Sequence, residues 1–376
     1  MIKILIAGDY SPMLRVSDLI EQGREQEIFS EVKELTVQMD YCVVNFESTV
    51  TDGTDKPIKK EGPNLSCAAK SLTSIKNAGF DMVTLANNHF ADYGDGAVRK
   101  SLEAIEAAKL DHVGGGKNIH EAETILIKKI KDKTFAFINC CEHEFTIADV
   151  DKGGSNPLMP IRQYYKITEA RSMADYVIVI VHGGHEYFQL PNLRMQETYR
   201  FFVDAGADAV INHHQHCFSG YEYYHNKPIA YGLGNFCFDN GIKKDKTWYE
   251  GFAIELDFDE GSIKTKLHPY IQCKEEATVS FLKDASPFEK KMTELNAVIK
   301  DREKLKKAVD DYYDTSSFHI LDIGEPWPRL YRLFARRLKL RVLPLFMYKH
   351  RTRFAGVVFC ESHFDKLRYA LKKMLR

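Results

Sequence analysis

The amino-acid sequence predicts an α/β fold, a layered sandwich of sheets and helices, over about its first 260 residues. Short aliphatic runs typical of strands alternate there with longer segments in which apolar residues recur at helical spacing. Strands that alternate with helices favour layers of helices packed on sheets. The strand candidates are Ile2–Ala7, Tyr41–Asn45, Met82–Leu85, Phe135–Asn139, Tyr176–Val181, Ala209–Asn212 and Ile229–Leu233.

Two of the helical segments between these strands are followed by glycines. Gly79 comes after the predicted helix at 65–78, and Gly206 comes after the predicted helix at 192–205. A helix C-terminus favours a left-handed residue, and glycine adopts that conformation without steric cost. The other elements predicted in this part are a helix at 96–110 and an antiparallel strand pair at 252–258 and 263–270.

The C-terminal part differs in pattern and in charge. A charged helical stretch at 287–313 precedes the helix-breaking run Gly-Glu-Pro-Trp-Pro at 324–328. From residue 327 onward, 14 Lys and Arg stand against two acidic residues, whereas the preceding 326 residues hold 38 basic and 51 acidic side chains. We therefore predict an α/β domain at 1–285 and a helical, basic extension at 286–376.

The basic extension carries an apolar stripe at helical spacing, formed by Leu330, Leu333, Phe334 and Leu338. We expect this stripe to pack on the acidic body, since a solvated arm needs no such row of large apolar side chains. Docking of the extension on an anionic membrane surface is the alternative. Nucleic acid is not an expected partner, because no nucleic-acid-binding module accompanies the basic charge.

No apolar run reaches the length of a membrane-spanning helix, and the run before Gly8 is too short for the core of a signal peptide. The eight cysteines form no CxxC pattern, and four of them lie in apolar runs, as expected of reduced, buried thiols. We therefore expect a cytoplasmic protein, peripheral at the inner membrane face if the extension docks there.

Polar residues of the kinds that bind metals follow five of the predicted strands. In chain order they are Asp9, Glu47, Asn88 with His89, His182, and finally His214 with His216. Each residue alone has an ordinary explanation: Asp9 could cap a turn, and the alternation of His214 and His216 on an extended backbone could be chance. However, the carboxyl ends of strands in an α/β sheet share one edge, where ligands bind. Carboxylates, imidazoles and an amide gathered at one edge indicate a dinuclear metal site.

In order and spacing, these segments resemble the capsule-synthesis CapA family of the broader calcineurin-like metallophosphoesterases. The run ANNHFADYG at 86–94 matches one diagnostic motif of that family, and residues 182–238 are similar to its signature half. The resemblance covers residues 1–260 and leaves the C-terminal extension unexplained. It implies a metallophosphoesterase-type fold and one or two divalent cations, with Mn, Fe, Zn and Mg all left open.

The resemblance also implies a role for each residue of the site. The implied metal ligands are Asp9, Glu47 as the bridging carboxylate, Asn88, His182, His214 and His216. His89 matches the acid that stands beside the leaving group. Glu186, Tyr187 and Asn235 match further positions of the motifs, and we place them in substrate binding. Ser11 departs from the pattern, because phosphoesterases usually carry a His there, so one metal position loses a nitrogen ligand.

These residues imply metal-dependent hydrolysis of a phosphorylated or capsule-polymer-related substrate, in the biosynthesis of a capsule, exopolysaccharide or poly-glutamate. Two cations suit the paired oxygens of a phosphoester, and His89 would protonate the leaving oxygen. The alternative is a non-catalytic accessory or binding subunit of a capsule-polymer assembly machinery that keeps the fold. A formed metal site favours the enzyme, and a collapsed, metal-free pocket favours the accessory subunit.

Overall fold

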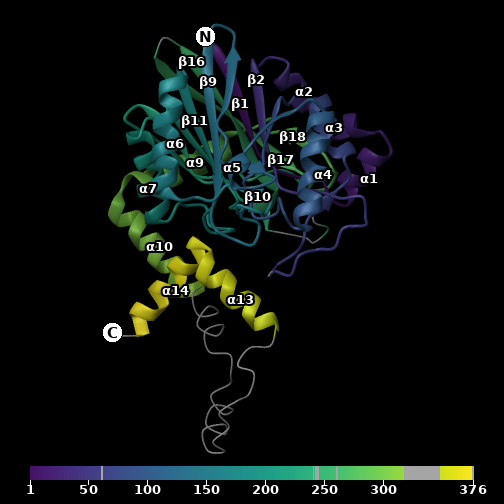
Figure 1. Ribbon diagram of the computed structural model, residues 1–376. Coiled ribbons are helices and arrows are strands. Elements are labelled where there is room, and N and C mark those ends of the chain that lie inside the picture. Colours follow the sequence, from purple (N-terminus) through teal and green to yellow (C-terminus); the bar gives the residue numbers. More distant parts are fainter. Residues whose placement is uncertain (61, 240, 242–244, 260, 317–347, 375–376) are drawn as a thin grey trace, which may run out of the picture.

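The computed structural model describes residues 1–376 except for 61, 240, 242–244, 260, 317–347 and 375–376. Two large sheets pack face to face, and helices cover the outer face of each sheet, which makes four layers (Figure 1). The predicted α/β class and its layered arrangement are therefore confirmed.

The first sheet has eight strands in the order β18-β17-β16-β1-β2-β5-β6, and β15 pairs with the end of β1. Strands β1, β2, β5 and β6 are parallel, so their carboxyl ends lie at one edge. The strands are β1 Ile2–Ser11, β2 Tyr41–Phe46, β5 Met82–Thr84, β6 Asp111–Val113, β15 Asn235–Phe238, β16 Glu250–Asp259, β17 Ser262–Gln272 and β18 Val279–Phe281.

The second sheet has six strands in the order β13-β14-β12-β11-β9-β8, in which β9, β11, β12 and β14 are parallel. Its strands are β8 Leu126–Ile130, β9 Lys133–Cys141, β11 Tyr176–His182, β12 Ala209–His213, β13 Tyr221–Tyr224 and β14 Lys227–Ala230. Two short pairs complete the strands: β3 Thr49–Val50 with β4 Ser66–Cys67, and β7 Gly115–Gly116 with β10 Gly154–Ser155.

The expectation that the site-bearing strands share one sheet edge is wrong. Strands β1, β2 and β5 belong to the first sheet, whereas β11 and β12 belong to the second. Both sets of parallel strands end on the same side of the molecule, toward the bottom of Figure 1. Each sheet buries its inner face against the other, and the stacking brings the two carboxyl edges side by side.

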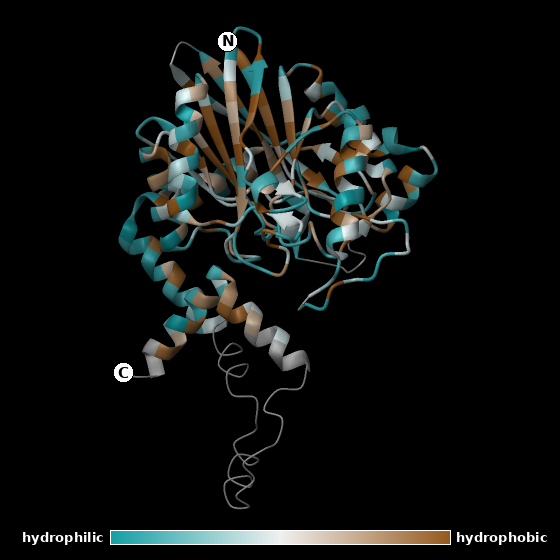
Figure 2. Ribbon diagram, in the orientation of Figure 1, coloured by the Kyte–Doolittle hydropathy of each residue, from teal (hydrophilic) through white to brown (hydrophobic). Residues whose placement is uncertain are grey.

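The side chains of β1 alternate between two apolar cores, one on each face of the first sheet. Ile4 and Ile6 point into the core between the sheets, while Leu5 and Ala7 point into the core under the helices of the first sheet. In Figure 2 the strands of both sheets are largely brown, whereas hydrophilic residues are frequent along the outer helices. The helices over the first sheet are α1 Arg15–Glu21, α2 Glu25–Thr36, α3 Lys70–Asn77 and α4 Gly94–Ala107. The helices over the second sheet are α6 Pro160–Met173 and α7 Leu193–Asp204. Two further helices, α5 Ile119–Ala122 and α8 Lys246–Tyr249, are only about one turn long.

The predicted glycine ends of two helices and the predicted burial of the cysteines are confirmed. Gly79 and Gly206 follow α3 and α7 with φ angles of 94° and 121°, which is the left-handed region. All eight cysteines lie within the described residues, where each is buried and free of a disulfide. No helix in the described ranges combines the length and the apolar character that crossing a membrane requires.

The charged stretch predicted as one helix consists of two, α9 Ser286–Lys300 and α10 Arg302–Ser316, because Asp301 between them has an extended backbone. Phe288, Leu295 and Leu305 of these helices are buried in the core of the second sheet. Helices α13 Tyr348–Phe359 and α14 Glu361–Met374 follow, and they lie below the carboxyl edges of the strands (Figure 1). The predicted stripe at 330–338 lies outside the described residues, and the domain boundary at 285 stays a prediction.

Candidate metal centre

The predicted ligands lie where the carboxyl edges of the two sheets meet. Asp9 is near the end of β1, and Glu47 directly follows β2. From the second sheet, His182 ends β11 and His214 directly follows β12. All four side chains are buried. The structure therefore brings together residues that are far apart in the sequence and belong to different sheets.

Glu47 occupies the middle of this arrangement. Its Oε1 lies 3.7 Å from Nε2 of His182, 3.9 Å from Nε2 of His216 and 3.9 Å from Nε2 of His89. Neither carboxylate oxygen of Glu47 has a hydrogen-bond partner among the described residues, although the side chain is fully buried. Burial, followed by the charge of Asp9, raises the pKa of Glu47 well above its usual value. A buried, unpaired carboxylate ringed by imidazoles is the chemistry that a cation satisfies.

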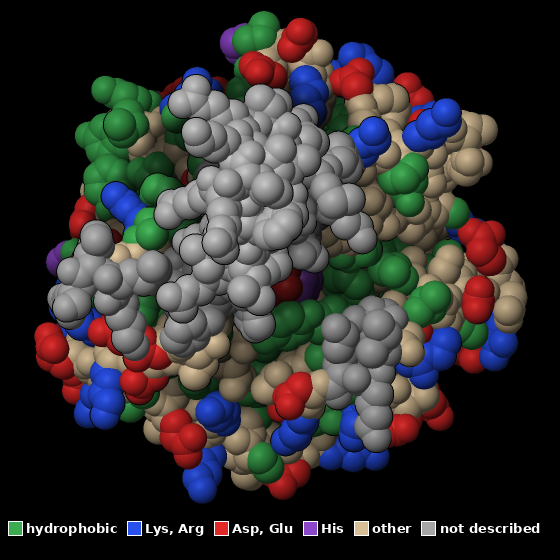
Figure 3. Space-filling view, turned by 90° about the horizontal axis from the view of Figure 1, so that it is seen from below, with side chains coloured by type: hydrophobic (Ala, Val, Ile, Leu, Met, Phe, Trp, Pro, Cys, Tyr) green, Lys and Arg blue, Asp and Glu red, His purple; other side chains and the backbone are tan. Residues whose placement is uncertain are grey.

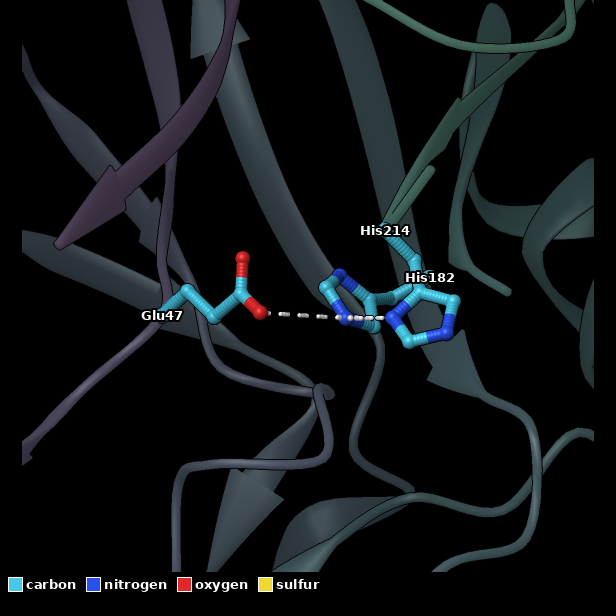
Figure 4. Close-up of side chains that lie close together, drawn as sticks. All are labelled: Glu47, His182 and His214. Atoms are coloured by element: carbon cyan, nitrogen blue, oxygen red, sulfur yellow. Dashed lines mark hydrogen bonds and ion pairs between the residues drawn. The ribbon is translucent and has the colours of Figure 1, made fainter. Parts of the chain in front are cut away.

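Two groups of candidate ligands share Glu47. The first group is Glu47, His182 and His214, drawn in Figure 4, and the second is Asp9, Glu47 and His216. Within each group the ligand atoms lie within 4.8 Å of one another. Carboxylate oxygens and imidazole nitrogens suit Mn, Fe and Zn. The donor set thus fits one or two divalent cations, and Glu47 is common to both groups.

Polar contacts orient the imidazoles of the first group. His182 directs Nε2 toward Asn88 Oδ1 at 3.0 Å and toward His214 Nδ1, also at 3.0 Å. On its other side, His182 Nδ1 lies 3.3 Å from the amide nitrogen of Asn45. Burial, and then the neighbouring histidines, lower the pKa of His182 well below its usual value. The ring is therefore neutral, as a metal ligand must be.

The second group is held by two asparagines. Asn45 donates from Nδ2 to Asp9 Oδ1 at 2.8 Å, and Asn235 Oδ1 lies 2.9 Å from His216 Nδ1. This contact leaves Nε2 of His216 facing Glu47. Ser11, which stands where the resemblance implies a His, is buried, and its Oγ has no hydrogen-bond partner within the described part of the chain. The second group thus offers two carboxylates and one imidazole as ligands.

The backbone around His214 and His216 differs from the expected extended strand. Strand β12 ends at His213, and His214 and His216 have φ angles of 91° and 53°. Left-handed conformations are costly for residues with a Cβ, by about 1–3 kcal/mol each, and persist where the surrounding structure requires them. His214 belongs to the ligand group with His182, and His216 belongs to the group with Asp9.

His89, the predicted acid, is bound on one side and faces the centre on the other. Its Nδ1 lies 2.6 Å from Asp92 Oδ2, and its Nε2 faces Glu47. Burial and then the charge of Lys60 lower the pKa of His89 to about 4. Asp92 and Lys60 were not predicted from the sequence, although Asp92 lies in the quoted motif.

The predicted substrate-binding residues separate into two kinds. Glu186 and Tyr187 are exposed at the rim, where Tyr187 stacks on Trp248 with the ring centroids 6.1 Å apart. Asn235, in contrast, is fully buried and contacts His216, so its position suits orienting a ligand. Seen from the carboxyl-edge side, histidine and acidic side chains lie at the floor of a hollow near the centre of this face (Figure 3).

The loop after β9 contributes carboxylates that sequence reasoning missed. Glu144 Oε1 lies 3.9 Å from His214 Nε2 and 3.9 Å from Cys360 Sγ, just before α14. Burial and then the charge of Glu186 raise the pKa of Glu144 to about 8. Two residues earlier, Glu142 accepts from the Ser362 hydroxyl at 2.5 Å. The C-terminal helices are therefore joined to the rim of the centre.

Arg194, at the start of α7, completes this junction. It donates to Glu142 Oε1 and to Asp365 Oδ2, at 2.7 Å in both cases. Glu142 is almost fully buried, with 3% of its surface exposed. Burial opposes its ionisation, but the charge of Arg194 and the hydrogen bond from Ser362 outweigh burial and lower the pKa of Glu142. The loop after β9, α7 and α14 thus form one ionic network.

Comparison with known proteins supplies the family. "Capsule biosynthesis protein CapA" of Bacillus anthracis is 31% identical over 249 residues, which are 64% of this chain and 61% of that protein. "PGA biosynthesis protein CapA" of Bacillus subtilis (strain 168) is 32% identical over 238 residues, 62% of each chain. The chain thus spans about three fifths of the length of these curated relatives.

Among solved structures, a "novel phosphatase" from Mycoplasma pneumoniae aligns with a TM-score of 0.44 and 16% identity, over 72% of this chain and 93% of that one. The family model described as "Bacterial capsule synthesis protein PGA_cap" matches residues 3–240, which is more than half of the chain. The resemblance to the CapA proteins is confirmed: this chain belongs to the bacterial capsule synthesis protein family PGA_cap.

Proposed function

We propose that this chain is a metal-dependent hydrolase that cleaves a phosphoester bond. The observation that carries the proposal is the environment of Glu47, a buried carboxylate with both oxygens unpaired and three imidazole nitrogens within 3.9 Å of Oε1. Asp9, Glu47, Asn88, His182, His214 and His216 would hold one or two divalent cations. Bound there, the cations would polarise a phosphoryl oxygen and lower the pKa of a coordinated water.

The protein residues around the centre then have defined tasks. The Asp9 and Glu47 carboxylates would neutralise the cations, and the His182 and His214 rings stay neutral because burial lowers the pKa of each ring. His89 directs Nε2 into the centre while Asp92 binds its Nδ1. A substrate phosphate beside Nε2 raises the pKa of the ring, since a nearby negative charge favours the protonated form. In that form His89 can donate a proton to the leaving oxygen.

The biological context of the substrate comes from the relatives. Both are named for capsule or PGA biosynthesis, so we propose a phosphorylated or capsule-polymer-related substrate in such a pathway. Contact of the basic extension with an anionic membrane surface belongs to the same proposal, because 14 basic residues follow residue 326. Liposome co-sedimentation with and without anionic lipid tests that contact.

The hydrolase proposal is tested on the purified full chain loaded with Mn²⁺. We expect turnover of bis(4-nitrophenyl) phosphate or 4-nitrophenyl phosphate that requires the metal. Glu47→Ala should abolish that turnover together with metal binding. A protein that binds metal at this centre yet hydrolyses neither phosphoester, nor a wider set of phosphorylated sugars and peptides, would contradict the proposal.

The second candidate function is a non-catalytic accessory subunit of a capsule-polymer assembly machinery. Ser11 favours it, because the group of Asp9, Glu47 and His216 lacks the nitrogen ligand that the family resemblance places there. A weakly filled second position would leave a centre that binds one cation and holds the fold without hydrolysis. Metal binding without turnover is the outcome that separates this candidate from the enzyme.

A further inference from the structure

Lys60 is a buried lysine with no place in either ligand group. Its side chain is only 2% exposed, although residues 52–59 of the same loop are mostly exposed. Its Nζ lies 2.5 Å from Asp92 Oδ1 and 3.1 Å from His89 Nδ1, and it donates to the carbonyl of Asn88 at 3.3 Å. Lysine is almost never buried without a partner, because a charge taken out of water costs free energy. The loop thus places the positively charged ammonium group of Lys60 against residues that border the metal centre.

Asp92 is the residue at which these contacts meet. Its Oδ2 lies 2.6 Å from His89 Nδ1 and accepts from the backbone N–H of Leu65 at 2.7 Å, while Oδ1 pairs with Lys60. In this fully buried carboxylate, Oδ2 is hydrogen-bonded, and the contact recorded for Oδ1 is the ion pair with Lys60. With Asp92 held in this orientation, the Nδ1–H of His89 donates to it and Nε2 is left facing Glu47. Without Lys60, one buried oxygen of Asp92 would lose its partner and the carboxylate could rotate.

We propose that Lys60 is a positioning residue: it holds Asp92 and the Asn88 carbonyl so that His89 Nε2 faces Glu47 and Asn88 Oδ1 faces His182. The kinetic part of this inference rests on the proposed hydrolase function. Because Lys60 acts through His89, it matters when the leaving oxygen needs a proton. An alkyl phosphoester needs that proton, whereas 4-nitrophenolate leaves without it.

Lys60→Met is compared with Lys60→Arg and with Lys100→Met in the full chain loaded with Mn²⁺. Lys100 is the matched control, because its Nζ pairs with Asp52 and Asp55 of the same loop, at 2.8 Å each. We expect Lys60→Met to lower kcat about 100-fold for an alkyl phosphodiester and less than about threefold for the 4-nitrophenyl ester. Lys60→Arg should restore most of the loss, and Lys100→Met should change neither rate.

A second measurement does not depend on turnover. In ¹H–¹⁵N NMR spectra of the protein, the Nδ1–H of His89 should give a downfield resonance that Lys100→Met keeps and His89→Gln removes. Lys60→Met should remove or broaden this resonance, since the ring loses its fixed acceptor. If Lys60→Met does not fold, Lys60→Gln replaces it in both comparisons.

If Lys60→Met lowered kcat equally for the two esters, or if Lys100→Met lowered kcat as much as Lys60→Met, Lys60 would only stabilise the loop and the inference would be wrong. An unchanged His89 resonance in Lys60→Met would overturn the inference independently. Absence of hydrolysis by the metal-loaded wild type would overturn the proposed function instead, and the NMR comparison would still decide the role of Lys60.

Discussion

His182 Nε2 lies 3.7 Å from Glu47 Oε1, although β11, which ends in His182, and β2, which precedes Glu47, belong to different sheets. On its other side, Glu47 faces His216 and shares the second ligand group with Asp9. The centre therefore exists only where the two sheets are packed together, and Glu47 is the residue common to both halves.

The two ligand groups should be separable by mutation. His216→Ala removes a ligand of the group with Asp9, and His214→Ala removes a ligand of the group with His182. We expect His216→Ala to keep one Mn²⁺ with the six-line EPR spectrum of an isolated ion. His214→Ala should lose the tighter ion, because the remaining group has Ser11 in place of a nitrogen ligand. Equal residual affinity in the two variants would contradict this ranking.

His89→Asn should separate chemistry from metal binding. The imidazole contacts Asp92 and faces Glu47, but it belongs to neither ligand group. Loss of a positioned acid lowers turnover by about 10²–10⁴-fold, and we expect that loss with the metal content unchanged. Metal analysis beside phosphodiester turnover measures both quantities, and His214→Ala is the control that should lose metal as well. Metal loss in His89→Asn as large as in His214→Ala would count against the division of roles.

Much of the fold could be predicted because its elements are local. The strands and the glycine ends of α3 and α7 follow from the spacing of apolar residues and from Gly79 and Gly206. The division of the strands between two sheets could not be predicted, since β2 and β11 have the same aliphatic pattern. Pairing partners depend on contacts between residues distant in the chain, and a strand's own composition does not specify them.

The candidate site could likewise be predicted only in part. Asp9, Glu47 and His182 could be predicted from the sequence because each lies where an apolar strand ends. The role of Lys60 could not be predicted from the sequence. The run Asp-Lys-Pro-Ile-Lys-Lys resembles an exposed loop, and only tertiary packing buries the side chain of its last lysine. Glu144 likewise could not be predicted, because its position depends on tertiary contacts with His214 and with Cys360, which precedes α14.

Arg194→Met should destabilise the protein and loosen α14. The substitution leaves the carboxylates of Glu142 and Asp365 without their cation. We expect a loss of about 2–3 kcal/mol in the free energy of unfolding, below the 3–5 kcal/mol of a fully buried pair because the Arg194 side chain is 30% exposed. Urea denaturation measures the loss. The control is Arg302→Met, which removes an exposed pair with Glu197 and should cost less than about 1 kcal/mol.

The packing of α14 against the loop after β9 should weaken as the pH rises. His143 contacts Glu361 at 2.5 Å, and this hydrogen bond raises the pKa of the imidazole above its ordinary value near 6.5. The charged pair therefore stabilises docking fully below pH 6.5, and the stabilisation is lost as the pH rises through the raised pKa. Hydrogen-exchange protection factors for α14 amides, corrected for intrinsic rates, should be higher at pH 6 than at pH 9.

His143→Gln is the control for this pH dependence. The glutamine keeps a hydrogen-bonding group but does not titrate, so the difference in protection between the two pH values should disappear. Protection that rises with pH in the wild-type protein would show that another group governs the docking of α14.

X-ray anomalous scattering from crystals of the full chain grown with Mn²⁺ tests the metal centre most directly. The account predicts an anomalous peak between Glu47, His182 and His214, with a weaker second peak between Asp9, Glu47 and His216. Metal-ligand distances near 2.0–2.3 Å should accompany the stronger peak. A fully ordered site with no anomalous peak at Glu47, in crystals that contain Mn²⁺ elsewhere, would contradict the account.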